Sequence, residues 1–215
     1  MDVLHLTERN QAAIVERVAS LLKRGGVVAV PTDTVYGLMA DVLRLAAVRK
    51  VFRIKARSHA KALPVFVRDI AMARHYAYVE QSLAPILGEL WPGQTTVVLR
   101  KREVMPDLVT GGSKTVGLRV PAYPFLTAVL AAFPNPLTAT SANLSGSEPA
   151  HSGVAVQNTF RRHIPRPDLV VDAGGLPPSR SSTVLDLTHP ENPKILRMGA
   201  ISKTELDKYL RITNP

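Results

Sequence analysis

The sequence predicts an α/β protein built on a twisted, mixed sheet with helices on its faces. One observation leads to this class, and a second shows that the chain is globular. Short apolar runs of strand length alternate along the chain with longer segments whose apolar residues recur at helical spacing. Hydrophobic residues make up 46% and charged residues 20% of the 215 residues, as in ordinary globular proteins. Because there is no internal repeat and no long linker, we expect one domain over 1–215.

The first part of the chain predicts two helix and strand pairs. Residues 11–23 place apolar side chains at helical spacing, and the pattern stops at Gly25. The run VVAV at 27–30 follows, and a continuous apolar run of this length is typical of a strand covered on both faces. A second helical pattern over 43–56 precedes a strand at 63–67.

The same alternation continues to the end of the chain. Further helical patterns lie near 82–90, 123–133 and 153–163. Strands are predicted at 95–99, 115–120, 169–174, 183–187 and 194–198. A last helix over 202–212 begins on Ser202, with Glu205 three residues later as in a capping box. Strands interspersed with helices in this way favour a mixed sheet.

Several classes of protein and site are excluded by what the chain lacks. No apolar stretch approaches the roughly 18 residues of a membrane span. The first ten residues have no basic segment followed by an apolar one, so we expect no secretion signal and a cytoplasmic protein. The absence of cysteine excludes disulfides and thiolate chemistry, and the histidines show no metal-binding spacing. The chain contains neither of the glycine-rich phosphate-binding motifs, G-x-x-x-x-G-K-[ST] and G-x-G-x-x-G.

The charge of the chain points to an anionic ligand. With 27 Lys and Arg against 17 Asp and Glu, the net charge is +10, which suits nucleic acid, nucleotides or phosphates, or a generally basic protein. Between Asp41 and Asp69 there are eight cationic residues and no acidic one. Arg49, Arg53 and Arg57 would line one side of a helix, where like charges repel, and this favours a bound anion.

Polar residues gather where apolar segments end. Lys55 and Arg57 close the second helix, either as a clamp on phosphates or as cations at a helix C-terminus. The stretch TATSANLSG at 138–146 offers hydroxyl and amide groups to a ligand, or forms a turn. Arg119 ends an apolar strand and needs a carboxylate partner, from the protein or from a ligand. Tyr36 either packs against a pocket or contacts substrate.

Five motifs together resemble the YrdC/TsaC family of threonylcarbamoyl-AMP synthases. They are PTDTVYGL, KAR followed by KALPVFV, TVGLRVP, SANLSG, and SSTVLDL with ILRMGAI, in the family's order over nearly the whole chain. The resemblance implies a twisted α/β sheet around a large positively charged cavity. It also implies a nucleotidyltransferase that makes L-threonylcarbamoyl-AMP and pyrophosphate from L-threonine, bicarbonate or CO2, and ATP. Other proteins then transfer the threonylcarbamoyl group to the adenosine next to the tRNA anticodon.

The resemblance also implies roles for individual residues. Lys55 with Arg57, and Ser141 with Asn143, match the family's K-x-R and S-x-N pairs, which implies a catalytic set around the phosphates. The residues implied at L-threonine are Thr32, Thr34, Arg119, Ala139 and Ser182. Those implied at ATP are Arg57, Lys61, Thr115, Ser141 and Arg197. A carbamate attacking phosphorus needs positioning and charge stabilisation rather than a covalent nucleophile, and Mg2+ would enter with ATP.

The chain departs from the family pattern at several places. It has WPGQTT where many relatives have WPGPLT, and RMG where they have R-P-G. Phe66 stands where some longer relatives have a threonine-contacting histidine, so no site is assigned there. Because the sequence ends soon after Arg197, we expect a short form without an additional C-terminal domain.

Two alternatives to the synthase stay open. One is a non-enzymatic double-stranded RNA-binding or ribosome-assembly protein of the same fold. The other is a paralogue with weak or different activity. The K-x-R and S-x-N pairs favour the enzyme, because an RNA backbone needs cations but no threonine-sized pocket of hydroxyls. Direct contact with tRNA or double-stranded RNA and the oligomeric state are left undecided.

Overall fold

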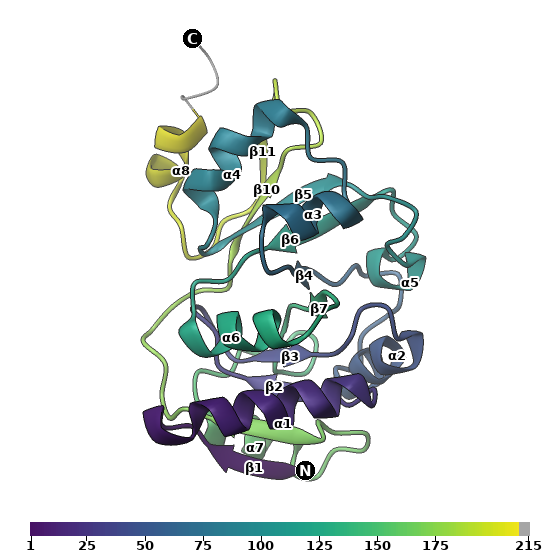
Figure 1. The fold of residues 1–215 in the computed structure, drawn as a ribbon, viewed down its shortest axis with the longest axis vertical. Coiled ribbons are helices and arrows are strands. Elements are labelled where there is room, and N and C mark those ends of the chain that lie inside the picture. Colours follow the sequence, from purple (N-terminus) through teal and green to yellow (C-terminus); the bar gives the residue numbers. More distant parts are fainter. Residues whose placement is uncertain (211–215) are drawn as a thin grey trace.

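The chain, described over residues 1–210 in a computed structural model, folds into two mixed sheets with helices around them (Figure 1). The α-helices are α1 Gln11–Lys23, α2 Leu45–Ile54, α3 Ile70–Tyr76, α4 Ala84–Leu90, α5 Asp107–Thr110, α6 Pro124–Ala132, α7 Gly153–Phe160 and α8 Lys203–Leu210. The strands are β1 Asp2–His5, β2 Val28–Val30, β3 Gly37–Met39, β4 Val65–Phe66, β5 Thr95–Arg100, β6 Thr115–Arg119, β7 Leu137–Thr138, β8 Thr140–Ser141, β9 Leu169–Asp172, β10 Thr183–Asp186 and β11 Lys194–Arg197.

The five-stranded sheet occupies the lower half of Figure 1 and has the order β1-β9-β2-β3-β8. Strand β9 pairs in parallel with both β1 and β2, whereas β3 runs antiparallel to β2 and β8. Helices α1 and α6 pack together against this sheet. The order places β8 beside β3, although about a hundred residues separate the two strands in the sequence.

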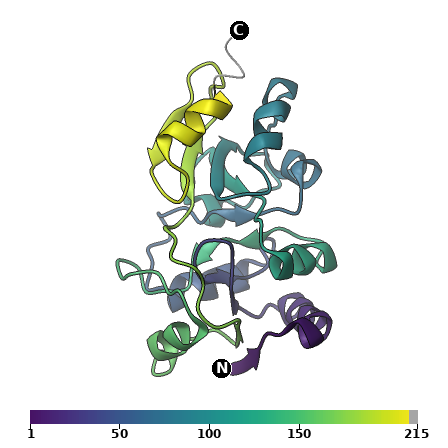
Figure 2. The same cartoon turned by 90° about the vertical axis from the view of Figure 1, so that its left-hand side faces the viewer.

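The six-stranded sheet occupies the upper half and has the order β11-β10-β5-β6-β4-β7. Strands β5 and β10 pair in parallel, as do β4 and β6, and the other neighbours are antiparallel. The segment between β9 and β10 passes from the lower sheet to the upper one along one side of the molecule (Figure 2). The two sheets thus approach each other at the ends of β4, β6 and β8.

Strand β2 explains how the core holds both sheets. Val28 and Val30 pack with α1 and α6, whereas Ala29 between them belongs to the larger cluster that extends into the six-stranded sheet. Side chains that alternate along a strand point to opposite faces, so β2 is covered on both sides, as its sequence predicts. All three side chains are fully buried.

The mixed α/β class and the predicted elements are confirmed, with shorter bounds for several strands. The strands divide between two sheets, which the order of elements along the chain does not reveal. The prediction omits β1, β3, α3, α5 and β8, and β8 has only two residues, too few for any periodicity. Ser202 accepts a hydrogen bond from the Glu205 N–H at 3.2 Å, as expected for the last helix. Residues 211 and 212 of that predicted helix lie outside the described residues.

One prediction about α2 is wrong. The helix ends at Ile54, so Arg57 does not continue the line of Arg49 and Arg53. The cause is a left-handed residue, Ala56, with a φ of 48°, which turns the chain away from the helix axis. Among the described residues, no helix is long and apolar enough to cross a membrane.

Candidate active site

The loop between β2 and β3 carries two threonines, Thr32 and Thr34, each 3% exposed. The Thr32 hydroxyl donates to the Val35 carbonyl at 2.7 Å and accepts from the Thr34 N–H at 3.1 Å. Thr32 therefore stabilises the turn itself, a role that hydroxyl residues take in many loops. The Thr34 hydroxyl lies 3.2 Å from the Nη1 of Arg119, which brings this loop to the end of β6.

Tyr36 holds the same loop in place rather than lining the site. It is fully buried, and its hydroxyl donates to the Gly174 carbonyl at 2.9 Å and accepts from the Ala173 N–H at 3.0 Å. Burial is the main cause that raises the pKa of Tyr36 to about 12. The phenol thus ties the loop to the start of the segment that joins the two sheets.

Arg119, at the end of β6, has a protein carboxylate as its partner. Its Nη2 donates to the Asp33 carboxylate at 2.6 Å, and its Nε donates to the Gly93 carbonyl at 2.8 Å. The arginine and aspartate side chains are 4% and 8% exposed. Burial lowers the pKa of Arg119, and the charge of Asp33 opposes this shift. A guanidinium has five N–H groups, so one on each terminal nitrogen is left for a ligand.

The end of α2 is built as a C-terminal capping motif. The Arg57 N–H donates to the Phe52 carbonyl at 3.0 Å and the Ala56 N–H to the Arg53 carbonyl at 3.1 Å, while Ala56 takes the left-handed conformation between them. This pair of bonds closes the last turn of many helices, most often with glycine at the left-handed position. Lys55 and Arg57 consequently leave the helix in different directions.

Lys55 lies beneath the turn that follows β8. It is 2% exposed, and its Nζ donates to the Ser141 carbonyl at 2.5 Å, the Asn143 carbonyl at 2.9 Å and the Asn143 Oδ1 at 3.0 Å. Burial, with a smaller contribution from the charge of Arg57, lowers the pKa of Lys55 to about 7. The three accepting oxygens favour the charged form and act against this shift.

A cavity of about 260 Å³ opens where the two sheets meet. Its wall contains eight of the residues assigned from the sequence: Thr32, Thr34, Arg57, Arg119, Ala139, Ser141, Ser182 and Arg197. The Ala139 N–H is engaged with the Pro64 carbonyl at 2.8 Å. The side chain of Phe66 also lines the cavity, with the guanidinium of Arg119 5.7 Å from the centre of its ring.

Two further arginines place positive charge on the cavity wall. The Nη2 of Arg57 donates to the Ala62 carbonyl at 2.9 Å, and the Nη2 of Arg197 donates to the Ser182 carbonyl at 2.7 Å. Burial lowers the pKa of both guanidiniums, and the charge of Arg197 adds to the effect on Arg57. Both nevertheless stay cationic at neutral pH, since arginine titrates far above it.

Four assigned residues lie elsewhere within the described chain. Lys55 and Asn143 are buried behind the cavity wall, on the far side of Ser141. The Lys61 side chain is exposed, although its carbonyl is close to the Nε of Arg57 at 3.4 Å. Thr115 lines a separate hollow of about 450 Å³, and its hydroxyl lies 2.9 Å from that of Ser113. The catalytic roles of Lys55 and Asn143 and the nucleotide-binding roles of Lys61 and Thr115 stay predictions.

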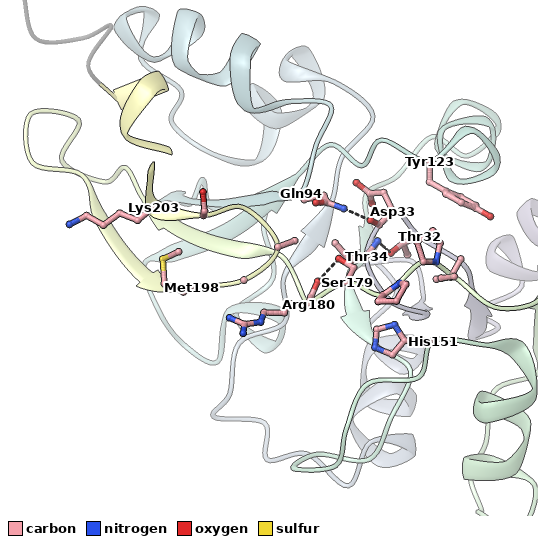
Figure 3. A pocket seen from close by; sticks show the side chains of 16 residues that line it. Thr32, Asp33, Thr34, Gln94, Tyr123, His151, Ser179, Arg180, Met198 and Lys203 are labelled. Atoms are coloured by element: carbon pink, nitrogen blue, oxygen red, sulfur yellow. Dashed lines mark hydrogen bonds between the residues drawn. The ribbon is translucent and has the colours of Figure 1, made fainter. Parts of the chain in front are cut away.

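A larger hollow of about 1160 Å³ adjoins the cavity and shares Thr32 and Thr34 with it (Figure 3). Figure 3 shows Asp33, Gln94, Tyr123 and His151 around this hollow, and the Gln94 amide donates to the Asp33 carbonyl. Residues 176–180, 198–200, 202 and 203 also line this hollow. The cavity with the arginines therefore has open space beside its threonine-rich end.

Sequence reasoning missed Asp33 and Gln94. Asp33 lies inside the PTDT motif, but its partner Arg119 is 86 residues away, so no local spacing connects the two. Gln94 belongs to the WPGQTT stretch, where the departure from the family pattern was the available signal. Within the described residues, no group of three or more acidic or histidine side chains is arranged to hold a metal ion.

Comparison with known proteins shows the family to which the chain belongs. The sequence model of the Sua5/YciO/YrdC family, described as "Telomere recombination", matches residues 20–199. The threonylcarbamoyl-AMP synthase of Pyrococcus abyssi is 32% identical over 209 residues, which cover 97% of this chain and 60% of that protein. That of Mus musculus is 36% identical over 199 residues, which cover 90% of this chain and 68% of the relative. A putative threonylcarbamoyl-AMP synthase of Methanocaldococcus jannaschii is 33% identical, and the alignment covers 94% of this chain and 93% of that protein.

Solved structures show the same fold. P. abyssi Sua5 complexed with L-threonine superposes with a TM-score of 0.91 at 30% identity, covering 97% of this chain and 61% of that one. YciO of E. coli superposes with a TM-score of 0.83 at 25% identity, and the match covers 95% of this chain and 98% of YciO. Both the matching sequence model and these relatives extend over most of the residues that build the cavity, and the chain accordingly belongs to the Sua5/YciO/YrdC family.

Proposed function

We propose that this chain is an L-threonylcarbamoyladenylate synthase. It takes L-threonine, bicarbonate or CO2, and ATP, and releases threonylcarbamoyl-AMP and pyrophosphate. The product serves separate transferase proteins that modify the adenosine next to the tRNA anticodon. The names of the related proteins and the L-threonine bound to P. abyssi Sua5 support this function. They do not favour a non-enzymatic RNA-binding protein.

One observation carries the proposal: three arginines, Arg57, Arg119 and Arg197, line one cavity. Arg119 lies at the threonine-rich end beside Thr34, and Arg57 and Arg197 lie on the same wall with Ser141. The two N–H groups left on Arg119 suit an amino-acid carboxylate. The cations of Arg57 and Arg197 suit phosphates, which they can neutralise during transfer.

The chemistry follows from this arrangement. The threonine amine and CO2 form a carbamate and release a proton. A carbamate oxygen then attacks the α-phosphorus of ATP, and the bond to pyrophosphate breaks as the new P–O bond forms. No side chain has to act as a covalent nucleophile, because the reaction needs alignment and stabilisation of negative charge. We assign L-threonine to Thr32, Thr34, Arg119, Ala139 and Ser182, and ATP to Arg57, Lys61, Thr115, Ser141 and Arg197.

The remaining features of the proposal are the metal, the domain and the setting. Mg2+ enters as part of the ATP substrate, held by its phosphates. Residues 1–215 act as a single domain in the cytoplasm, and the positive surface can contact tRNA or double-stranded RNA through its phosphates.

The decisive experiment is product formation by the purified chain. With ATP, Mg2+, bicarbonate and L-threonine, we expect pyrophosphate release that depends on threonine, and an adenylate with the mass of threonylcarbamoyl-AMP. Arg57→Ala should abolish turnover and leave the unfolding curve unchanged. Pyrophosphate release that is the same with and without L-threonine would overturn the proposal.

A further inference from the structure

The K-x-R and S-x-N pairs divide between the cavity wall and the layer behind it. Arg57 and Ser141 line the cavity, whereas Lys55 and Asn143 are 2% and 6% exposed and lie behind Ser141. We propose that Lys55 and Asn143 are positioning residues that hold the turn carrying Ser141, and that Arg57 and Ser141 are the members that contact the nucleotide. The contact with nucleotide rests on the proposed function, but the positioning of the turn does not.

Lys55 has no N–H group left for a phosphate. An ammonium offers three N–H donors, and the structure shows three acceptors within hydrogen-bond distance, two backbone carbonyls and the Asn143 Oδ1. All three belong to residues 141 and 143. To bind a phosphate directly, Lys55 would have to give up one or more of these bonds to buried oxygen atoms, which costs free energy.

Asn143 connects Lys55 to Ser141 through hydrogen bonds. Its Oδ1 accepts from Lys55 and also from the Ser141 hydroxyl at 2.6 Å, and its Nδ2 donates to the Ser147 carbonyl at 2.5 Å. These contacts determine which way the amide faces, because only its oxygen can accept from both neighbours. The Ser141 hydroxyl is consequently held at one place on the cavity wall.

The backbone supports the same division. The left-handed Ala56 separates Lys55 from Arg57, so the ammonium points to the turn and the guanidinium lines the cavity. The Ser145 N–H donates to the Lys55 carbonyl at 2.9 Å, which binds the turn to Lys55 by main chain as well as by side chain. An anion beside Arg57 would offset the repulsion between the two cations and favour the charged, bonded form of Lys55.

Hydrogen exchange of the ligand-free protein tests the positioning role. In Lys55→Met, we expect the amides of Asn143, Ser145 and Ser147 to exchange about tenfold faster or more, because the turn loses three bonds to a charged donor. Arg53→Met, an exposed change on the same helix, should leave these rates unaltered. Arg57→Met should also leave them unaltered, while weakening the binding of MgATP. If Lys55→Met does not fold, Asn143→Ala provides the same comparison.

A double-mutant cycle on MgATP affinity and on kcat/KM tests the route of action. If Lys55 acts through Asn143, the Lys55→Met and Asn143→Ala double variant should lose little more than the worse single variant. The fold losses of MgATP affinity and of kcat/KM caused by Lys55→Met and by Arg57→Met should multiply in the variant that carries both changes. Unchanged exchange in the turn, or independent losses for Lys55→Met and Asn143→Ala, would overturn the inference. A wild-type chain that forms no threonine-dependent product would overturn the proposed function alone, since exchange still reports on the turn.

Discussion

The pair of Arg119 and Asp33 shows what single residues contribute at the site. Both side chains are nearly inaccessible to solvent, and the Asp33 Oδ2 accepts a further bond from the Ala122 N–H at 3.1 Å. A buried pair gains little over apolar residues of the same size, but removal of one partner leaves an uncompensated charge. Arg119 thus serves the fold and the ligand at once.

Replacement of the arginine should expose this double role. Arg119→Met should lower the free energy of unfolding by about 3–5 kcal/mol, because Asp33 stays buried without its cation. Urea unfolding measures the loss. Arg49→Met, an exposed change on α2, should shift stability by no more than about 0.5 kcal/mol. Equal stability of the two variants would show that the buried pair contributes nothing to the fold.

The C-terminus of α2 shows how the end of a helix positions functional side chains. The capping bonds of Arg57 and Ala56 end the helix where the two cations must separate. An alanine in the left-handed region is strained by roughly 1 kcal/mol relative to glycine, because its Cβ crowds the following carbonyl. The element therefore stores a small strain next to the site.

A glycine substitution measures this strain. Ala56→Gly should raise the free energy of unfolding by up to about 1 kcal/mol. Ala46→Gly, at the second residue of the same helix, should lower it by up to about 1 kcal/mol. Thermal or urea unfolding distinguishes the two signs. A loss of stability in Ala56→Gly equal to that in Ala46→Gly would mean that Ala56 is not strained.

The cations predicted around α2 are less free than the sequence indicates. No acidic residue lies between Asp41 and Asp69, yet the Nζ of Lys50 lies 2.6 Å from a carboxylate oxygen of Asp168. The same carboxylate accepts from the Val27 N–H at 2.7 Å, so it joins α2 to the start of β2. A charge count along the sequence cannot detect a partner 118 residues away.

At the scale of the molecule, the site exists because two sheets meet. The cavity takes Ser141 from β8 of one sheet and Arg119 and Arg197 from β6 and β11 of the other. A ligand that touches both sheets binds the folded state alone, so its binding adds to stability. The free energy of unfolding of the whole chain therefore depends on whether a ligand occupies the cavity.

Threonine should therefore protect the chain from unfolding. At a concentration of about 100 Kd, L-threonine should raise the free energy of unfolding by about 2.7 kcal/mol. A urea titration with and without the amino acid measures this. D-Threonine should have a much smaller effect, since its carboxylate, amine and hydroxyl cannot all reach the same partners. An equal shift with both enantiomers would contradict a specific threonine site.

By itself the sequence determined most of the helices and strands and, through the family resemblance, a set of candidate site residues. Periodicity over 11–23 and the apolar run at 27–30 predict α1 and β2, because local spacing decides which face of an element is buried. Eight of the twelve residues assigned by resemblance line one cavity. Only the tertiary structure decided that Arg119 is paired with Asp33 and that Lys55 lies behind the wall. Such partners are distant in the sequence, and the packing of the two sheets brings them together.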